Sequence, residues 1–349
     1  MKILFGAEND GLHISPTDPN GYEWWYFDAV SDDERYVLVV IFFLGTPMSP
    51  YYKAVVDGKN PVPNDWCGVF VTLHERTRSG YAERAYAYNV YKGGAFAPDG
   101  ATVAVGGSRF VREGNAWNLS LEERGLWLGA VRGNLSFAAD FLPGHTPIPG
   151  DEAHTWVCVA PDCRVSGDLT LASGEAVRFA GRGYHDHNFG RLPWMDTPAW
   201  YWGRTHFARD KPVCGLIQYS WFAGSEPRRV VLTWTPTGAT TVTRNVQNST
   251  DEDDFDVAQL FTRRKRPIFH STIKGFGESD LQSVKVSQPI GWSGLQESPF
   301  YSRFPLVTEA RFAGGGKGSY IGIGELFRPV GLTGEIMSVA LWTRIRRRS

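Results

Sequence analysis

Short apolar or alternating runs recur along the chain between turn signals, and long amphipathic helix patterns are nearly absent. These runs cover residues 36–44, 66–73, 101–105, 177–179, 213–222, 230–234 and 320–326. Turn sequences such as Asp57-Gly58 and Pro236-Thr237-Gly238 separate them. Short runs bounded by Gly and Pro are typical of antiparallel strands. The pattern therefore predicts an all-β fold built as barrels or sandwiches.

With 349 residues, the chain exceeds the usual size of a single core, which predicts one large or two medium domains. Two similar aromatic segments, residues 23–28 (EWWYFD) and 199–204 (AWYWGR), each stand where a β unit is predicted to begin. No repeat with a fixed period of about 20 to 50 residues accompanies them, which disfavours a propeller or a solenoid. We therefore predict two packed β domains, residues 1–190 and residues 191–349.

The formal net charge is -1, with 36 Lys and Arg against 37 Asp and Glu, so the sequence shows no electrostatic footprint for nucleic acid. The four cysteines form no CxxC pair, which argues against a zinc ribbon and favours small buried side chains. The first residues lack the apolar segment of a signal peptide, and no apolar run reaches about 18 residues. These features predict a soluble cytoplasmic protein.

Near the C-terminus, the apolar run 336–342 (IMSVALW) leads into Arg344, Arg346, Arg347 and Arg348. Two interpretations are open. The segment is a last strand or helix with a charged end, or it rests on an anionic membrane surface through its Trp and its basic tail. Peripheral membrane contact therefore stays an option.

The segment 183–190 (GYHDHNFG) places a phenol, a carboxyl, two imidazoles and an amide between glycines. On a strand, Tyr184, Asp186 and Asn188 share one face, whereas His185 and His187 share the other. Three interpretations are open. The histidines chelate a metal with a third ligand from elsewhere, Tyr184 and Asp186 form a metal-free acid-base pair, or the run is a polar turn.

Several ordered segments suggest a family. Residues 21–33 (GYEWWYFDAVSDD) are followed by 43–45 (FLG) and 49–52 (SPYY). The segment 154–156 (HTW) precedes the pattern Gly-Tyr-x-Asp-x-Asn at 183–188 by about thirty residues, and 326–329 (LFRP) lies further on. Together these segments span most of the chain and resemble the carotenoid 1,2-hydratase (hydroxyneurosporene synthase) family.

That resemblance implies a pair of lipocalin-like antiparallel β-barrel domains. It also implies a hydro-lyase that adds water to an isolated C=C bond of a carotenoid or other isoprenoid, with no organic cofactor and no metal. Carried onto this sequence, the functional positions of the family are His154, Trp156, Tyr184 and Asp186, with Asp186 as the proton donor. His154 and Trp156 share a strand face, as Tyr184 and Asp186 do.

The implied chemistry accounts for these residue types. Protonation of a trisubstituted alkene gives a tertiary cation, so the site needs a strong acid that is held neutral in an apolar pocket. Aromatic faces stabilise such a cation by about 2 kcal/mol or more each when water is excluded. Water then adds to the cation, and His154 takes its proton.

A further set of residues is predicted to bind the substrate: Trp24, Trp25, Tyr26, Asn188, Trp202 and Arg204. The alternative for residues 24–26 is the core, since large aromatic side chains dominate cores. The alternative for Arg204, which lies near His206, is an ion pair on the strand surface. Glu23 is either a second acid or the partner of a buried polar group.

The central motif departs from the hydratase pattern Gly-Tyr-Phe-Asp-Thr-Asn at His185 and His187. Three functions stay open for an apolar isoprenoid or polyene ligand. They are the hydratase, a natural-product cyclase or pericyclase (Diels-Alderase type) of secondary metabolism whose pocket templates the reaction, and a non-enzymatic carrier. A carrier has little use for a buried acid, so Tyr184 and Asp186 favour catalysis.

Overall fold

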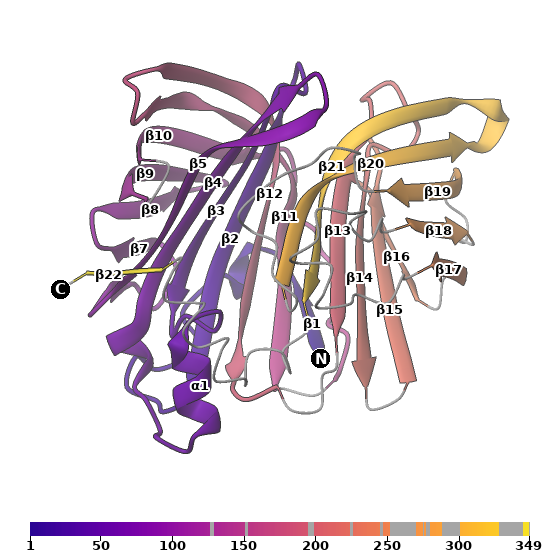
Figure 1. Cartoon of the computed structure of the whole chain (residues 1–349). Coiled ribbons are helices and arrows are strands. Elements are labelled where there is room, and N and C mark those ends of the chain that lie inside the picture. The colour runs from indigo at the N-terminus through magenta and orange to yellow at the C-terminus, as the bar shows by residue number, and fades with distance from the viewer. Residues whose placement is uncertain are drawn as a thin grey trace. The chain divides into compact units, whose positions relative to one another are not determined.

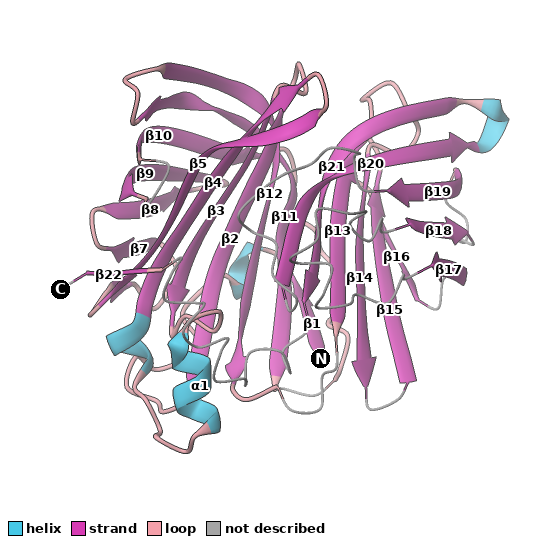
Figure 2. Ribbon diagram, in the orientation of Figure 1, coloured by secondary structure: helices cyan, strands magenta, loops and turns pink. Residues whose placement is uncertain are grey.

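The computed structural model describes residues 1–125, 129–150, 153–194, 199–223, 226–244, 247–251, 270–274, 276, 280–287, 301–327 and 345–348. Strands dominate this part of the chain, and Figure 2 shows helix there only in short stretches. These stretches are α1 (Pro50–Val56) and the 3-10 turns η1 (Ala7–Asn9), η2 (Pro63–Trp66) and η4 (Ala313–Gly315). Each run predicted as a strand overlaps one, so the all-β prediction is confirmed.

One sheet has thirteen strands in the order β22-β5-β4-β3-β2-β12-β11-β10-β9-β8-β7-β6, with β1 beside β11 (Figure 1). The strands are β1 (Lys2–Phe5), β2 (Gly21–Ser31), β3 (Tyr36–Leu44), β4 (Cys67–Thr77), β5 (Gly80–Tyr91), β6 (Ala95–Phe96), β7 (Thr102–Val105), β8 (Ser108–Glu113), β9 (Ala116–Arg124), β10 (Ala130–Ala139), β11 (His154–Leu171), β12 (Ala176–Arg191) and β22 (Arg346–Arg348). The central pairs β3-β2, β2-β12 and β12-β11 are antiparallel, whereas β1 and β22 run parallel to β11 and β5.

The other sheet has nine strands in the order β16-β15-β14-β13-β21-β20-β19-β18-β17. They are β13 (Trp200–His206), β14 (Gly215–Ala223), β15 (Glu226–Trp234), β16 (Thr240–Arg244), β17 (Gln247–Asp251), β18 (His270–Lys274), β19 (Leu281–Ser287), β20 (Tyr301–Phe312) and β21 (Lys317–Phe327). All of its neighbouring strands run antiparallel. Each of the two sheets curls (Figure 1).

Two compact units make up the chain. The first combines Met1–Glu75, Glu83–Trp194 and Leu332–Ser349, and the second combines Arg76–Ala82 and Met195–Gly331. The thirteen-stranded sheet lies almost entirely in the first unit, and the nine-stranded sheet lies in the second. The domain boundary between residues 190 and 191 stays a prediction.

The centre of the thirteen-stranded sheet is dry on both faces. Every residue of β2 and of β3 is buried, and β3 reads as a continuous apolar run because neither of its faces meets water. Strand β9 instead alternates buried positions with more exposed ones, as a strand with one wet face does. Because β12 pairs with β2, its polar run lies in the driest part of this sheet.

The main hydrophobic cluster of the first unit lies on one face of these central strands. From β2 it takes Trp25, Phe27 and Ala29 but not Trp24 or Tyr26. Trp24 and Tyr26 are also buried, and they point to the opposite face because side chains alternate along a strand. The two faces of β12 therefore meet different surroundings.

Three further predictions concern the cysteines, a membrane-spanning helix and the C-terminal segment. All four cysteines are free and buried, as the sequence predicted. No helix in the described part of the chain is long and apolar enough to cross a membrane. The apolar run at 336–342 lies outside the described residues, whereas residues 346–348 of the basic tail form β22, at the edge of the thirteen-stranded sheet.

Candidate active site

Strand β12, which carries the predicted residues Tyr184, Asp186 and Asn188, lies between β2 on one side and β11 on the other. Directly paired residues of neighbouring strands point to the same face, so the register decides which side chains meet. The face that we call the Asp186 face combines Tyr184, Asp186 and Asn188 with Trp24, Tyr26 and Asp28 of β2 and with His154, Trp156 and Cys158 of β11. The register thus brings both predicted pairs, His154 with Trp156 and Tyr184 with Asp186, onto one face.

Strand β11 is irregular beside this group. Its register against β12 shifts between Cys158 and Ala160 and again between Ala160 and Cys163. Such bulges bend a strand and recur next to active sites, where they change the direction of a side chain. Before the first shift Cys158 pairs with Asp186, and after it Ala160 pairs with His185 on the other face.

Asp186 is the centre of a buried hydrogen-bond network. Its Oδ2 accepts from the Tyr184 hydroxyl at 2.8 Å and from the Trp156 indole N–H at 3.1 Å. Its Oδ1 accepts from the Asn188 amide at 2.8 Å. Asp186 is 5% exposed, and its three partners are less exposed still. Water does not compete for these bonds, so each is stronger than it would be at the surface.

The pKa of Tyr184 reflects the exclusion of water from this network. Burial, with a further contribution from the charge of Asp186, raises the pKa of the Tyr184 hydroxyl well above its ordinary value. The hydroxyl therefore keeps its proton and donates it in the hydrogen bond to Asp186. The Trp156 indole N–H also lies 3.3 Å from the Tyr184 oxygen, so both donors hold the same side of the carboxyl.

His154 lies in a cluster of aromatic rings on the same face. Its Nδ1 is 2.5 Å from the Tyr22 hydroxyl, which accepts from the Trp194 indole N–H at 3.1 Å. The ring centroids of Trp24 and His154 are 5.6 Å apart. Burial lowers the pKa of His154 to about 3, so its ring is neutral at neutral pH. A neutral imidazole has a lone pair that accepts a proton.

Asp28 is a second carboxyl on this face, and it is not among the residues predicted from the sequence. It is fully buried, and its Oδ2 accepts from the Tyr26 hydroxyl at 2.7 Å. The register sets Tyr26 opposite Asp186 and Asp28 opposite Tyr184, so two Tyr-Asp pairs lie side by side on adjacent strands. A signal existed in the sequence, because Trp24, Tyr26 and Asp28 follow one another with the period of a strand.

The opposite face of β12 holds a buried ionic cluster of Asp10, Glu23, His185 and His187, which we call the His187 face. His185 Nδ1 lies 2.9 Å from the Tyr26 carbonyl oxygen, and its Nε2 lies 3.2 Å from Asp10 Oδ2. His187 Nε2 lies 2.7 Å from Glu23 Oε1. None of the four side chains is exposed to solvent, so their polar atoms meet protein groups in place of water.

The partners on the His187 face also set its protonation. Burial lowers the pKa of His187, but the nearby carboxylates of Asp10 and Glu23 outweigh burial and raise that pKa to about 9. Burial raises the pKa of Asp10, yet His185 and His187 together hold it well below its usual range. Glu23 is thus the partner of a buried polar group, the second of its two sequence interpretations.

The remaining predicted residues lie elsewhere. Trp25 points to the His187 face, where it belongs to the main hydrophobic cluster and stacks on His187 with ring centroids 4.6 Å apart. Trp202 and Arg204 lie on β13 of the second unit. Arg204 is buried, and its Nη1 lies 2.5 Å from His206 Nδ1, so the interpretation as a surface ion pair is wrong.

Comparison with known proteins shows which proteins are similar to this chain in sequence. The family model for carotenoid hydratase CrtC matches residues 40–251. Hydroxyneurosporene dehydrogenase of Chlorobaculum tepidum is 29% identical over 367 residues, which cover 94% of this chain and 88% of that protein. Acyclic carotenoid 1,2-hydratase of Thiocapsa roseopersicina is 32% identical over 192 residues, which cover 54% of this chain and 45% of that protein.

The fold of this chain is also similar to the folds of solved structures. The crystal structure of an AttH protein from Nitrosomonas europaea is similar to this chain with a TM-score of 0.58 and 12% identity. The match covers 92% of this chain and 95% of that chain. At this identity the likeness concerns the fold alone, and it confirms the predicted class of two lipocalin-like antiparallel β units.

Proposed function

The chain belongs to the carotenoid hydratase CrtC family, and on that premise we propose that it adds water to an isolated C=C bond of a carotenoid or other isoprenoid. The observation that carries the proposal is the buried carboxyl of Asp186, bonded to Tyr184 and Trp156 on a face that His154 shares. These are the four positions that the family resemblance implies. The proposed reaction is that of a hydro-lyase and needs no organic cofactor.

Asp186 is the proposed proton donor. As its proton moves to the alkene, negative charge develops on the carboxyl, and the donors of Tyr184, Trp156 and Asn188 already point at its two oxygens. Donors that are in place before the charge develops lower the barrier, because nothing has to reorganise during the reaction. Two of these donors hold Oδ2, and the third holds Oδ1.

Aromatic rings on the Asp186 face stabilise the resulting cation in this proposal. Protonation of the less substituted alkene carbon leaves a tertiary cation on its neighbour. The Trp156 and Tyr184 rings flank the acid, and the Tyr26 ring lies 6.0 Å from that of Tyr184. The face of each such ring stabilises a desolvated cation by about 2 kcal/mol or more. The same rings are apolar, as an isoprenoid substrate requires.

His154 is the proposed proton acceptor for the attacking water. Its depressed pKa keeps the ring neutral. The Tyr22 hydroxyl also lies 3.3 Å from the Ala153 carbonyl oxygen, and when it donates there, His154 Nδ1–H donates to Tyr22 and Nε2 carries the lone pair. The water oxygen bonds to the cationic carbon, and its proton passes to Nε2. Return of a proton to Asp186 completes the net addition of H and OH.

The test is incubation of the purified chain with lycopene, neurosporene and shorter acyclic terpenoids in oxygen-18 water, followed by mass spectrometry. Chelator-treated and metal-replete samples are run in parallel. Labelled hydroxylated product in both samples, lost in Asp186→Asn, is the expected result. No labelled product with any of these prenyl chains would overturn the hydratase and favour the cyclase. Near-normal turnover by Asp186→Asn would overturn the assigned acid.

A further inference from the structure

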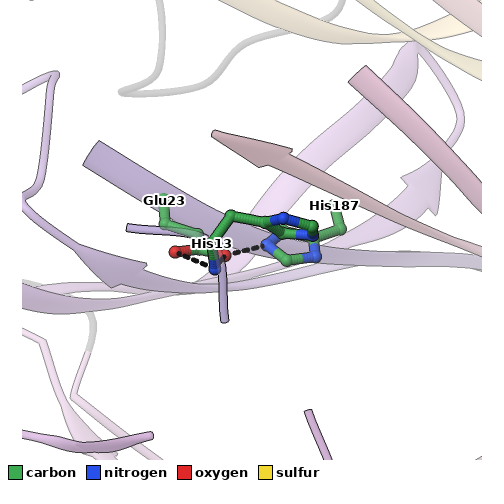
Figure 3. Close-up of side chains that lie close together, drawn as sticks. All are labelled: His13, Glu23 and His187. Atoms are coloured by element: carbon green, nitrogen blue, oxygen red, sulfur yellow. Dashed lines mark hydrogen bonds and ion pairs between the residues drawn. The ribbon is translucent and has the colours of Figure 1, made fainter. Parts of the chain in front are cut away.

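Three side chains of the types that bind metals lie close together although they come from separate parts of the chain. They belong to His13, Glu23 and His187 (Figure 3). One ligand atom of each lies within 4.8 Å of those of the other two. The rings of His13 and His187 are 5.5 Å apart between centroids, and Glu23 Oε1 lies 2.7 Å from His187 Nε2. Two imidazoles and one carboxylate form a ligand set that zinc uses, with a fourth position for water.

Each histidine already has the outer partner that a metal ligand needs. Metal-bound histidines donate their second ring N–H to a carbonyl or a carboxylate, which orients the ring. His13 Nε2 lies 3.0 Å from the Asn9 carbonyl oxygen, so donation there leaves the lone pair on Nδ1. His187 Nδ1 faces Asp10 Oδ1 at 3.4 Å, so a proton on Nδ1 leaves the lone pair on Nε2. Asp10 is itself held by the Trp117 indole N–H at 2.9 Å.

The carboxylate of Glu23 is also held in place by hydrogen bonds from the backbone. Glu23 is fully buried, and the backbone N–H groups of His13 and Ile14 donate to its carboxylate at 2.9 Å and 2.8 Å.

His187 Nδ1 and Asp10 Oδ1, by contrast, are buried without a hydrogen bond in the described part of the chain. A cation on His187 Nε2 makes Nδ1–H a stronger donor and so improves this long contact with Asp10.

We propose that His13, Glu23 and His187 bind one divalent cation of the zinc class. Zinc lies about 2.0–2.2 Å from nitrogen and oxygen ligands, which places tetrahedral ligand atoms about 3.4 Å apart. The cation therefore takes the place of the hydrogen between His187 and Glu23 and draws His13 inward. His13 is exposed, which gives the ion access, and its ring stacks on Phe189 with centroids 3.8 Å apart.

The site acts as a clamp in this proposal. His13 belongs to the segment that precedes β2, Glu23 lies on β2 and His187 lies on β12, so the ion ties that segment to the centre of the sheet. His187 points to the face opposite Asp186. The proposal is therefore independent of the hydration chemistry, and metal binding is expected whether or not the chain is a hydratase.

The test uses the full chain after treatment with a chelator. Calorimetric titration with zinc chloride is expected to give one ion per chain, and cobalt(II) is expected to give the visible absorption of a four-coordinate site. His13→Ala is the diagnostic variant, because His13 is exposed at the surface, and circular dichroism checks that the variant keeps the fold. We expect at least about tenfold weaker zinc binding, the loss that follows even the removal of an outer partner of a ligand.

His145→Ala is the matched control. His145 is a half-buried histidine of the same unit that packs on Phe5 and lies outside the trio, so its removal is expected to leave zinc affinity unchanged. Glu23→Gln tests the carboxylate in the same titration and is expected to weaken binding as well. The proposal is overturned if the wild-type chain binds no stoichiometric zinc, if His13→Ala binds like wild type, or if His145→Ala loses as much affinity.

Discussion

The two faces of β12 are both buried and both polar, yet they stabilise their carboxyl groups in different ways. On the Asp186 face, the carboxyl accepts from the neutral groups of Tyr184, Trp156 and Asn188. On the His187 face, the carboxylates Asp10 and Glu23 face the two imidazoles. Neutral donors place no opposite charge beside a carboxyl, whereas a cationic imidazole does and so favours its ionised form. The comparison favours chemistry on the first face and structure on the second.

The largest expected effect separates the two carboxyls of the Asp186 face. Asp186→Asn removes the proposed proton donor and is expected to lower turnover by about 10²–10⁴-fold, the usual contribution of a general acid. Asp28→Asn changes an equally buried carboxyl that also accepts from a tyrosine, and it is expected to retain most turnover. Initial rates of labelled product measure both. Equal losses would show that the two Tyr-Asp pairs act as one unit.

The next effect concerns stability and should be larger on the His187 face. Asp10→Asn leaves the buried His187 without one of its counter-charges and is expected to lower the free energy of unfolding by about 3–5 kcal/mol. Asp186→Asn keeps the shape of the site and leaves no unpaired cation, so its cost is expected to be about 1–3 kcal/mol. Urea unfolding at pH 7 in chelator measures both. A smaller loss for Asp10→Asn would contradict the comparison.

The third effect is a pH dependence of the free energy of unfolding, and it comes from His154 on the Asp186 face. Because burial lowers the pKa of His154 to about 3, the folded state binds its proton less readily than the unfolded state does. The contribution of neutral His154 to stability is complete above about pH 6.5 and is lost as the pH falls toward 3, by at most about 1.4 kcal/mol per pH unit.

The measurement for His154 is the free energy of unfolding at pH 7, 5.5 and 4.5 for the wild-type chain and for His154→Gln. The variant is expected to lose less stability over this range. Parallel pH profiles would place the protonation of His154 outside this transition.

The smallest expected effect is a lack of reaction. Burial and the charge of Asp186 raise the pKa of the Cys158 thiol, and all four cysteines are buried. A thiol-specific reagent such as Ellman's reagent is therefore expected to modify none of them in the native chain and all of them after unfolding. Prompt labelling of Cys158, located by peptide mass spectrometry, would show that a polar reagent reaches this thiol in the native chain.

Local backbone geometry made the distribution of side chains between the two faces of β12 predictable from the sequence. Alternation along an extended strand was enough to separate Tyr184 and Asp186 from His185 and His187, because a period of two residues needs no knowledge of the fold. The same rule would have placed Asp28 with Trp24 and Tyr26. It also opposes Trp25 to them, and the structure puts Trp25 in the hydrophobic cluster.

By itself, the sequence determined the all-β class, the positions of seven of the strands and the division of the polar side chains of residues 184–188 between two strand faces, since apolar patterning and backbone alternation are local properties. Only the tertiary structure decided the partners. Glu23 meets His187 across 164 residues, and Asp10 meets His185 across 175 residues. Such contacts depend on the register between strands and on the path of the segment before β2. Both are fixed by burial across the whole sheet, which no local pattern encodes.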